Sequence, residues 1–218
     1  MKRYTIGFMA AVVMMINFGS PVLAETNPKS GAKIVWMDDS NEVLLRDANG
    51  NPIQSELGFL LERGCTVQTG NSTVEMTLVP NGSVIVIDKN TLFRIDSLYG
   101  RDGTSDNNVF SLVRGKIRFI AARITGAFYS VQTPTAAAGV RGTDFYRMYD
   151  PQAGKDWLCV TEGAVQFDSP AGDKGVLVPA GFFVNLKNGF HTAEPDAEWL
   201  KTNLNLNTLH GAVPPAQS

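Results

Sequence analysis

The stretch TPTAAAGVRGTDFYRM, Thr133 to Met148, holds the residue types that come closest to a site for chemistry. Arg141 lies between Gly139 and Gly142, a combination that binds phosphate where a glycine-rich loop follows a strand and opens a helix. Here the glycines precede TDFYRMYD, a β-branched and aromatic run that is typical of a strand. The stretch therefore predicts a tight turn that leads into a strand, with Arg141 bonded to nearby carbonyl or carboxylate oxygens.

Candidate catalytic residues are few. His191 and His210 are the two histidines, and both lie in the last part of the chain. A Ser-His-Asp unit needs an imidazole that is held between nucleophile and acid, which such a position does not favour. Asp38 and Asp39 are adjacent, so on a strand they would point to opposite faces, and a turn explains them better than a carboxylate pair. We expect a protein that is not an enzyme and carries no cofactor.

Metal binding is not favoured either. The segment 47–51, DANGN, places oxygen ligands at alternating positions, but Pro52 follows where an EF-hand requires glycine. Cys65 and Cys159 are the two cysteines, and no histidine pair accompanies them. In an oxidising compartment they could form one disulfide; the alternative is two buried reduced thiols.

The elements that must position these residues are predicted to be strands. Apolar and polar residues alternate with a period of two from about residue 31 to 190, without a convincing amphipathic helix. The segment DDSN between AKIVWM and EVLLRD predicts a hairpin, and Asn49-Gly50 and Asn81-Gly82 predict two further turns. Only EPDAEWLKTNLNLNTLHG near the end predicts a helix, which would begin at Pro195-Asp196 and end at Gly211, before a frayed tail.

A weak internal repeat runs through the predicted strands. Each copy has an apolar residue, then a glycine, then an alternating strand, as in LLERGCTV and SLVRGKIRF. The spacing is too uneven for a strict solenoid. We predict a recurrent turn before each strand, where glycine supplies a positive φ or a close backbone approach. The glycines of the repeat are Gly64, Gly115, Gly142, Gly163 and Gly181.

One strand carries large side chains on both faces. Phe145, Arg147 and Tyr149 share one face, and Tyr146 and Met148 share the other. In a sheet with two faces, one face is normally core and the other is wet. Either one set forms a binding patch, or both faces of the sheet are covered.

The stretch VQTPTAAAGVRGTDF resembles the signature of the FecR domain family. The motif residues of this sequence are Val131, Thr133, Pro134, Gly139, Val140, Arg141, Gly142, Thr143 and Phe145. Other glycine–strand units agree in order, so the resemblance spans about residues 31–187, with Cys65 at a position where the family often has Asp. It implies an all-β periplasmic domain, solenoid-like or built of two packed sheets. We expect the motif residues to be structural, with Arg141 holding the turn.

The best-known FecR proteins are transmembrane regulators of iron-siderophore uptake, in which a cytoplasmic anti-sigma segment and one membrane helix precede the domain. The resemblance here covers the extracytoplasmic domain. Direct anti-sigma action is therefore not expected.

The first residues predict export. A basic start at Lys2-Arg3, an apolar run over Ile6–Phe18 and small residues before Glu25 are typical of a secretory signal peptide that is cleaved after Ala24. The apolar run is too short to span a membrane. Cleavage would leave 17 basic against 21 acidic residues, a balance that argues against nucleic acid.

Together, these patterns predict a signal peptide (1–24), a FecR-like β domain (25–190), and a short helix with a flexible tail (191–218). We expect a periplasmic, non-enzymatic binding, sensing or scaffold module in cell-envelope signalling. Its partner would be a protein or a cell-envelope component, with no nucleic acid and no integral membrane segment after cleavage. The alternative is a glycan-binding module that recognises peptidoglycan.

Overall fold

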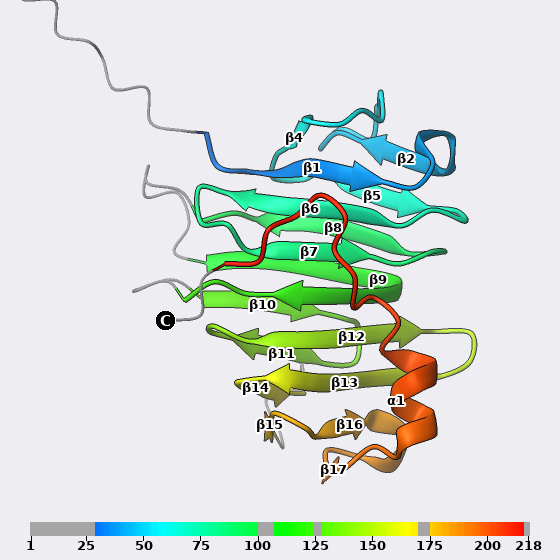
Figure 1. The fold of residues 1–218 in the computed structure, drawn as a ribbon, viewed down its shortest axis with the longest axis vertical. Helices are drawn as coiled ribbons and strands as arrows, with labels where there is room; N and C mark the ends of the chain where they lie inside the picture. Colours follow the sequence, from blue (N-terminus) through cyan, green and yellow to red (C-terminus); the bar gives the residue numbers. More distant parts are fainter. Residues whose placement is uncertain (1–28, 100–106, 124–127, 170–174, 216–218) are drawn as a thin grey trace, which may run out of the picture.

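The computed structural model describes residues 29–99, 107–123, 128–169 and 175–215, so the expected signal peptide lies outside the described residues. Two β-sheets, sheet A and sheet B, form most of this part of the chain (Figure 1). Strand β9 (Asn107–Ile120) belongs to both, because its first half pairs in sheet B and its second half in sheet A. The expectation of an all-β fold with a short C-terminal helix is confirmed.

The strands of each sheet follow a simple spatial order. Sheet A contains β4 (Leu60–Leu61), β1 (Gly31–Met37), β6 (Val74–Val79), β7 (Val84–Ile87), β9, β12 (Asp144–Asp150), β13 (Lys155–Glu162), β16 (Phe183–Asn185) and β17 (Thr192–Ala193). Sheet B contains β3 (Pro52–Ile53), β2 (Val43–Arg46), β5 (Thr66–Thr69), β8 (Leu92–Ser97), β9, β10 (Phe128–Gln132), β11 (Ala137–Val140), β14 (Ala164–Asp168) and β15 (Val176–Pro179). The β9–β10 pair is parallel and the other described pairs are antiparallel.

The main core lies between the two sheets. Alternate residues of every long strand point inward, as the period of two predicts, and the inward side chains are fully buried. Phe119 is at the centre, with its ring centroid 5.2 Å from that of Tyr129 and 5.7 Å from those of Phe110 and Phe145. Each such side chain contributes about 1.5–3 kcal/mol through burial.

The glycines of the repeat all adopt positive φ, between 64° and 99°, as predicted. The predicted turn before a strand is confirmed at Gly64, Gly142, Gly163 and Gly181 but not at Gly115. Gly115 shows why glycine is needed. It lies inside β9, where the strand passes from sheet B to sheet A, and an added Cβ would come within 2.6 Å of the Thr91 Cα atom. Glycine therefore permits both the bend and the close approach.

The predicted DDSN hairpin is wrong. β1 pairs with β4 and β6 in sheet A, whereas β2 pairs with β3 and β5 in sheet B. The 3₁₀ helix η1 (Ser40–Glu42), capped by the Asp39 side chain, turns the chain away from sheet A before it can fold back on β1. The other two predicted turns are confirmed, since β2 pairs with β3 around Asn49-Gly50 and β6 with β7 around Asn81-Gly82.

The C-terminal part differs from the prediction. Helix α1 (Ala197–Asn203) begins as expected, with the Asp196 carboxylate accepting the Trp199 N–H at 2.7 Å, but it ends well before Gly211. Asparagines are poor helix formers, and the chain continues in extended form. Residues 204–215, which we call the strap, cross the outer face of sheet A (red in Figure 1). Of the expected frayed tail, residues 212–218, Ala212 is buried and Val213 is exposed, and residues 216–218 lie outside the described residues.

The strap and α1 cover a row of side chains on the outer face of sheet A. In cross-strand register the row consists of Trp36, Glu75, Val86, Arg118, Tyr146, Cys159 and Phe183. Buried residues of this row form a second hydrophobic cluster with Leu206 and Ala212. The aromatic strand β12 thus has both faces covered, which is the second of the two alternatives that its sequence allows.

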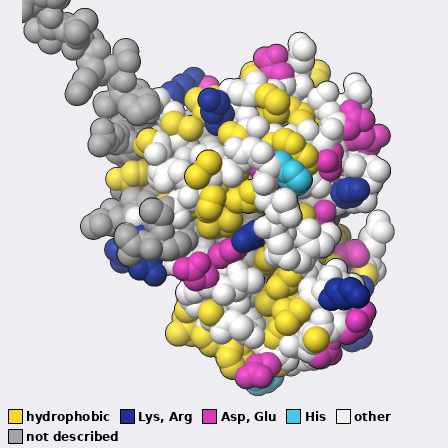
Figure 2. Space-filling view, viewed as in Figure 1, with side chains coloured by type: hydrophobic (Ala, Val, Ile, Leu, Met, Phe, Trp, Pro, Cys, Tyr) yellow, Lys and Arg dark blue, Asp and Glu magenta, His cyan; other side chains and the backbone are white. Residues whose placement is uncertain are grey.

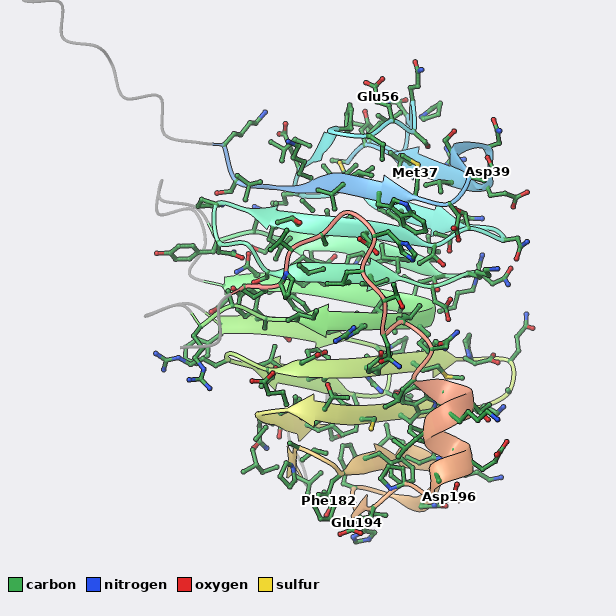
Figure 3. All side chains as sticks on the ribbon, viewed as in Figure 1. Met37, Asp39, Glu56, Phe182, Glu194 and Asp196 are labelled. Atoms are coloured by element: carbon green, nitrogen blue, oxygen red, sulfur yellow. The ribbon has the colours of Figure 1, made fainter. Side chains whose placement is uncertain are left out.

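The surface has mixed charge. Basic and acidic side chains are interspersed on the face seen in Figure 2, with apolar groups exposed between them. Acidic side chains stand at both ends of the stack, with Asp39 and Glu56 at one end and Glu194 and Asp196 at the other (Figure 3). Charges at the ends of a sheet discourage edge-to-edge association. Within the described ranges, no helix is long and apolar enough to cross a membrane.

Candidate binding site

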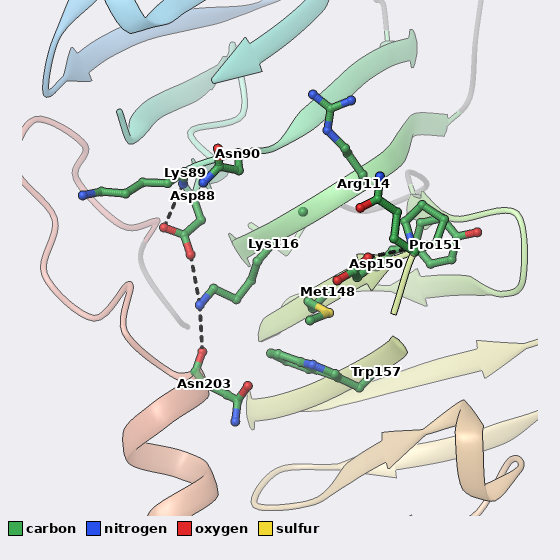
Figure 4. A pocket seen from close by; sticks show the side chains of 13 residues that line it. Asp88, Lys89, Asn90, Arg114, Lys116, Met148, Asp150, Pro151, Trp157 and Asn203 are labelled. Carbon is green, nitrogen blue, oxygen red and sulfur yellow. Dashed lines mark hydrogen bonds and ion pairs between the residues drawn. The ribbon is translucent and has the colours of Figure 1, made fainter. Parts of the chain in front are cut away.

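A groove of about 470 Å³ opens beside the covered row of sheet A (Figure 4). Its floor is the next cross-strand row, Lys116 on β9, Met148 on β12 and Trp157 on β13. The walls are two turns, one around residues 88–90 between β7 and β8 and one around residues 150–152 after β12, and the end of α1. Segments far apart in sequence therefore build the groove.

Lys116 is the central charge of the groove. Its Nζ lies 3.0 Å from a carboxylate oxygen of Asp88 and donates to the carbonyl of Asn203 at 3.3 Å and to the side chain of Asn205 (Figure 4 shows the first two partners). Both members of the ion pair are largely buried. Lys116 therefore joins the groove floor to α1 and to the strap.

The rim carries cations without partners. Lys89 and Arg114 are exposed, and neither side chain forms a hydrogen bond or ion pair with the described part of the chain. The Asp150 carboxylate is used within its own turn, where it accepts the N–H groups of Gln152 and Ala153 at 3.0 Å. The groove can thus bind an anionic group at its rim beside apolar contacts on Met148 and Pro151.

The family motif runs through β10 and β11 of sheet B to the start of β12, beside the main core. Thr133, in the turn after β10, accepts a hydrogen bond from Arg147 Nη2 at 2.9 Å and donates to Asp156 at 2.9 Å. Arg147 is fully buried, pairs with Asp156, and packs on the Phe167 ring at 4.7 Å. Burial lowers the pKa of Arg147 to about 9, so the guanidinium stays protonated at neutral pH.

Most of the other motif residues occupy packing positions. Val140, Thr143 and Phe145 are buried, and Gly142 leaves no space for a Cβ, which would lie 2.1 Å from the Arg123 side chain. Pro134 is exposed in its turn and Gly139 is half-buried on β11.

Arg141 does not occupy a packing position. The expectation that it bonds to oxygens of its turn is wrong, because its side chain is exposed and forms no hydrogen bond or ion pair with the described residues. The buried ionic role belongs to Arg147, six residues later. The sequence carries a signal for this, since Arg147 shares a strand face with buried Phe145 and a charge on a core face requires a partner.

The histidines and cysteines do not form a site. His210 stacks on Trp36 with ring centroids 4.2 Å apart, and His191 is exposed. In the described ranges, no three His, Cys, Asp or Glu residues are grouped as metal ligands. Cys65 and Cys159 are free thiols in different buried clusters, so the considered disulfide is absent and the alternative of two buried thiols holds. Burial raises the pKa of the Cys159 thiol to about 11.

Fold and groove together define an all-β module with a surface site suited to binding. Residues 65–166 match the family model described as FecR protein, so this part of the chain is a FecR domain. The resemblance of the VRGT motif and its flanking units is thereby confirmed. A search of the curated proteins found no match.

Two solved structures have a similar fold. They are crystal structures at 1.65 Å and 2.50 Å, each described as a proposed anti-sigma factor from Parabacteroides distasonis ATCC 8503. Sequence identity is 22% and 21%, and the TM-score is 0.52 for both. The match covers 65% of this chain and 65% and 64% of those chains, so about a third of each lies outside the comparison. The similarity establishes the fold.

Proposed function

We propose that this chain is a non-enzymatic binding and sensing module of cell-envelope signalling. The FecR domain over residues 65–166 is the observation that carries the proposal. The shared fold of proteins described as proposed anti-sigma factors supports a regulatory role. The charged groups Arg147 and Asp156 bond to each other inside the core, so they serve packing and not a surface site.

The proposed location is the periplasm. The basic start, the short apolar run and the small residues before Glu25 support export with cleavage after Ala24. The mature chain would then meet its partner in the cell envelope as a separate module.

The proposed contact surface is the groove above Lys116. Lys89 and Arg114 on its rim would attract an acidic segment, and Met148 and Pro151 would accept an apolar side chain. Unpartnered rim charges act mainly on the association rate, and a buried apolar anchor supplies most of the affinity. The partner that fits is a protein surface on which an apolar residue is flanked by carboxylates.

A crosslinking pull-down from the periplasm tests this proposal. The bait is the mature chain from Glu25, compared with the double variant Lys89→Ala/Arg114→Ala. We expect the wild-type bait to capture a specific protein and the variant to lose it. The matched control is Arg63→Ala/Lys155→Ala, which removes two exposed cations outside the groove. Equal capture by both double variants would move the contact away from the groove, and no captured protein would reject protein binding.

The second candidate, glycan binding, is favoured by one observation. Asn90, Gln152 and Asn203 also line the groove, whose floor holds the Trp157 ring, and amides beside an aromatic ring are suited to sugar hydroxyls. The same bait on isolated peptidoglycan distinguishes the two candidates. Glycan binding would be supported if the Lys89→Ala/Arg114→Ala variant is still retained on peptidoglycan and the Gln152→Ala variant is not.

A further inference from the structure

The strap is bound to sheet A through its main chain. The Glu75 carboxylate on β6 accepts hydrogen bonds from the backbone N–H groups of His210, Gly211 and Ala212, at 2.7, 2.8 and 2.9 Å. Glu75 has no solvent exposure. A buried carboxylate is tolerated only when donors surround it, and three consecutive N–H groups satisfy that requirement.

Arg118 binds the strap as a hydrogen-bond donor, whereas Glu75 binds it as an acceptor. Its Nη1 donates to the carbonyl oxygens of Leu206 and Asn207, at 2.9 and 3.0 Å. A bidentate pair with Asp144 orients the guanidinium, with Nε–Oδ1 and Nη2–Oδ2 distances of 3.0 and 2.6 Å. Burial opposes the charge, but the bonds to Asp144 raise the pKa of Arg118 above its ordinary value. The outer face of sheet A thus presents an acceptor and a donor to a passing main chain.

Side chains of the strap also contact sheet A. The Tyr146 hydroxyl donates to the side chain of Asn207 at 2.6 Å, and Leu204 and Leu209 pack against the second hydrophobic cluster. Leu206 and Ala212 are buried, and the His210 ring stacks on Trp36. Gly211 lies against the β-bulge at Val35, where an added Cβ would be 2.6 Å from the Val35 carbonyl oxygen and 2.9 Å from the Trp36 Cβ. Binding of an extended segment at this face therefore requires glycine beside Val35 and apolar residues at the positions that Leu206 and Ala212 occupy.

The strap is not integrated into the sheet. Its residues belong to no strand, so it makes no ladder of backbone hydrogen bonds with β1 or β7. A cavity of about 250 Å³ remains where it passes Trp36, Glu75 and Val86. Apolar contacts of Leu206 and Ala212 and a small set of hydrogen bonds therefore hold the strap without backbone pairing. A segment outside the sheet ladders opens locally at lower cost than a paired strand.

We infer that this outer face of sheet A is a peptide-binding site, which the strap occupies in this structure and which an extended segment of a partner protein takes over by exchange. The incoming segment must supply consecutive N–H groups to Glu75, carbonyls to Arg118, and a glycine beside Val35. Simple release of the strap is disfavoured, because it would expose the apolar side chains that Leu206 and Ala212 pack against on sheet A. The inference rests on the proposed binding function and names the chemistry of the partner.

Exchange would also act on the groove. Lys116 bonds to Asn203 and Asn205, which stand where α1 passes into the strap. Departure of the strap removes the Asn205 contact and leaves Lys116 with Asp88 and the Asn203 carbonyl. Occupation of the sheet A site and of the groove are therefore coupled through one side chain.

The test uses a labelled peptide with the sequence of residues 203–213, NLNLNTLHGAV, and the mature chain from Glu25. Gly211→Val in the chain should expel the strap, so we expect this variant to bind the wild-type peptide about tenfold or more tighter than the wild-type chain does. A peptide carrying the same Gly-to-Val change should not bind. Adding Glu75→Gln to the Gly211→Val chain should weaken the binding by about tenfold. Val213→Thr, at an exposed strap position, should leave the peptide affinity at the wild-type value.

The inference is overturned if the Gly211→Val chain binds the peptide no tighter than the wild type, or if Glu75→Gln has no effect on that binding. A wild-type dimer with the strap crosslinked between protomers would assign the site to a second copy and also overturn it. Hydrogen exchange on the wild-type chain tests opening even if Gly211→Val fails to fold. The backbone amides of residues 210–212 should exchange their hydrogens faster than those of β9 and β12. Equal protection of the two sets would contradict replacement of the strap by a partner. None of these measurements uses the native partner, so they can fail independently of the pull-down.

Discussion

The backbone N–H of Gly211 donates to the carboxylate of Glu75 at 2.8 Å, across 136 positions of the sequence. This bond and its two neighbours attach the end of the chain to β6, a strand of the first half. The outer face of sheet A is closed by residues from near the end of the sequence, and one buried carboxylate supplies three of the hydrogen bonds that hold them.

Glu75→Gln should lower the free energy of unfolding by about 1–3 kcal/mol. The amide is a weaker acceptor for three N–H groups, and its own NH₂ group would be buried. Urea denaturation measures the change. Glu198→Gln, an exposed acid on α1, serves as the matched control and should stay within about 0.5 kcal/mol of the wild type. If the two variants were equally stable, the Glu75 contacts would contribute nothing.

Arg147→Met should destabilise the domain by about 3–5 kcal/mol, because Asp156 is left buried without a countercharge. The double variant Arg147→Met/Asp156→Leu should recover most of that loss, since apolar pairs of similar size often replace buried ion pairs. Arg141→Ala removes an exposed arginine and should change the free energy by less than about 0.5 kcal/mol. A large loss from Arg141→Ala would show that the turn depends on it after all.

Gly115→Ala should cost more stability than Gly82→Ala, although both glycines have positive φ, at 99° and 77°. The conformational penalty, about 1–2 kcal/mol, is common to both. At Gly82 an added Cβ meets nothing within 4 Å, whereas at Gly115 it overlaps Thr91. Thermal and urea denaturation of the two variants separate the cost of the backbone conformation from the cost of steric overlap with Thr91. Equal losses would mean that Thr91 moves aside without cost.

Alkaline pH should unfold the domain partly through two tyrosines. Burial raises the pKa of Tyr129 and of Tyr146 from 10 to about 12. Because the folded pKa exceeds the unfolded one, this stabilisation is complete below pH 10 and is lost as pH rises to about 12. The free energy of unfolding, measured across this range, should fall with pH, and Tyr146→Phe should make the slope shallower. An unchanged slope would contradict the burial of the Tyr146 hydroxyl as the cause.

Local sequence patterns predict much of the fold. The alternation of apolar and polar residues is set by neighbours two positions apart, so the strands and their inward faces follow from it. The glycines at 64, 115, 142, 163 and 181 also follow, since a positive φ is a property of one residue. The family motif identifies the FecR domain for the same reason, because it is contiguous in sequence.

Other features of the fold could not be predicted from residues that are neighbours in the sequence. The DDSN segment has the composition of a hairpin turn, but η1 carries the chain to the facing sheet, where Val43 and Leu45 join the main core. The groove is lined by residues from the β7–β8 turn, β9, β12, β13 and α1, so no local sequence pattern predicts it.

The sequence by itself therefore determined the all-β class, the glycine turns and the FecR domain of this protein, because these depend on backbone preferences and on contiguous residues. Tertiary structure alone decided which arginine is buried, that the last residues close sheet A, and where a ligand can bind. The physical reason is that a charged side chain such as Arg147 or Glu75 can be buried only where other parts of the chain place a hydrogen-bonding or oppositely charged group beside it. That placement depends on how the whole chain packs.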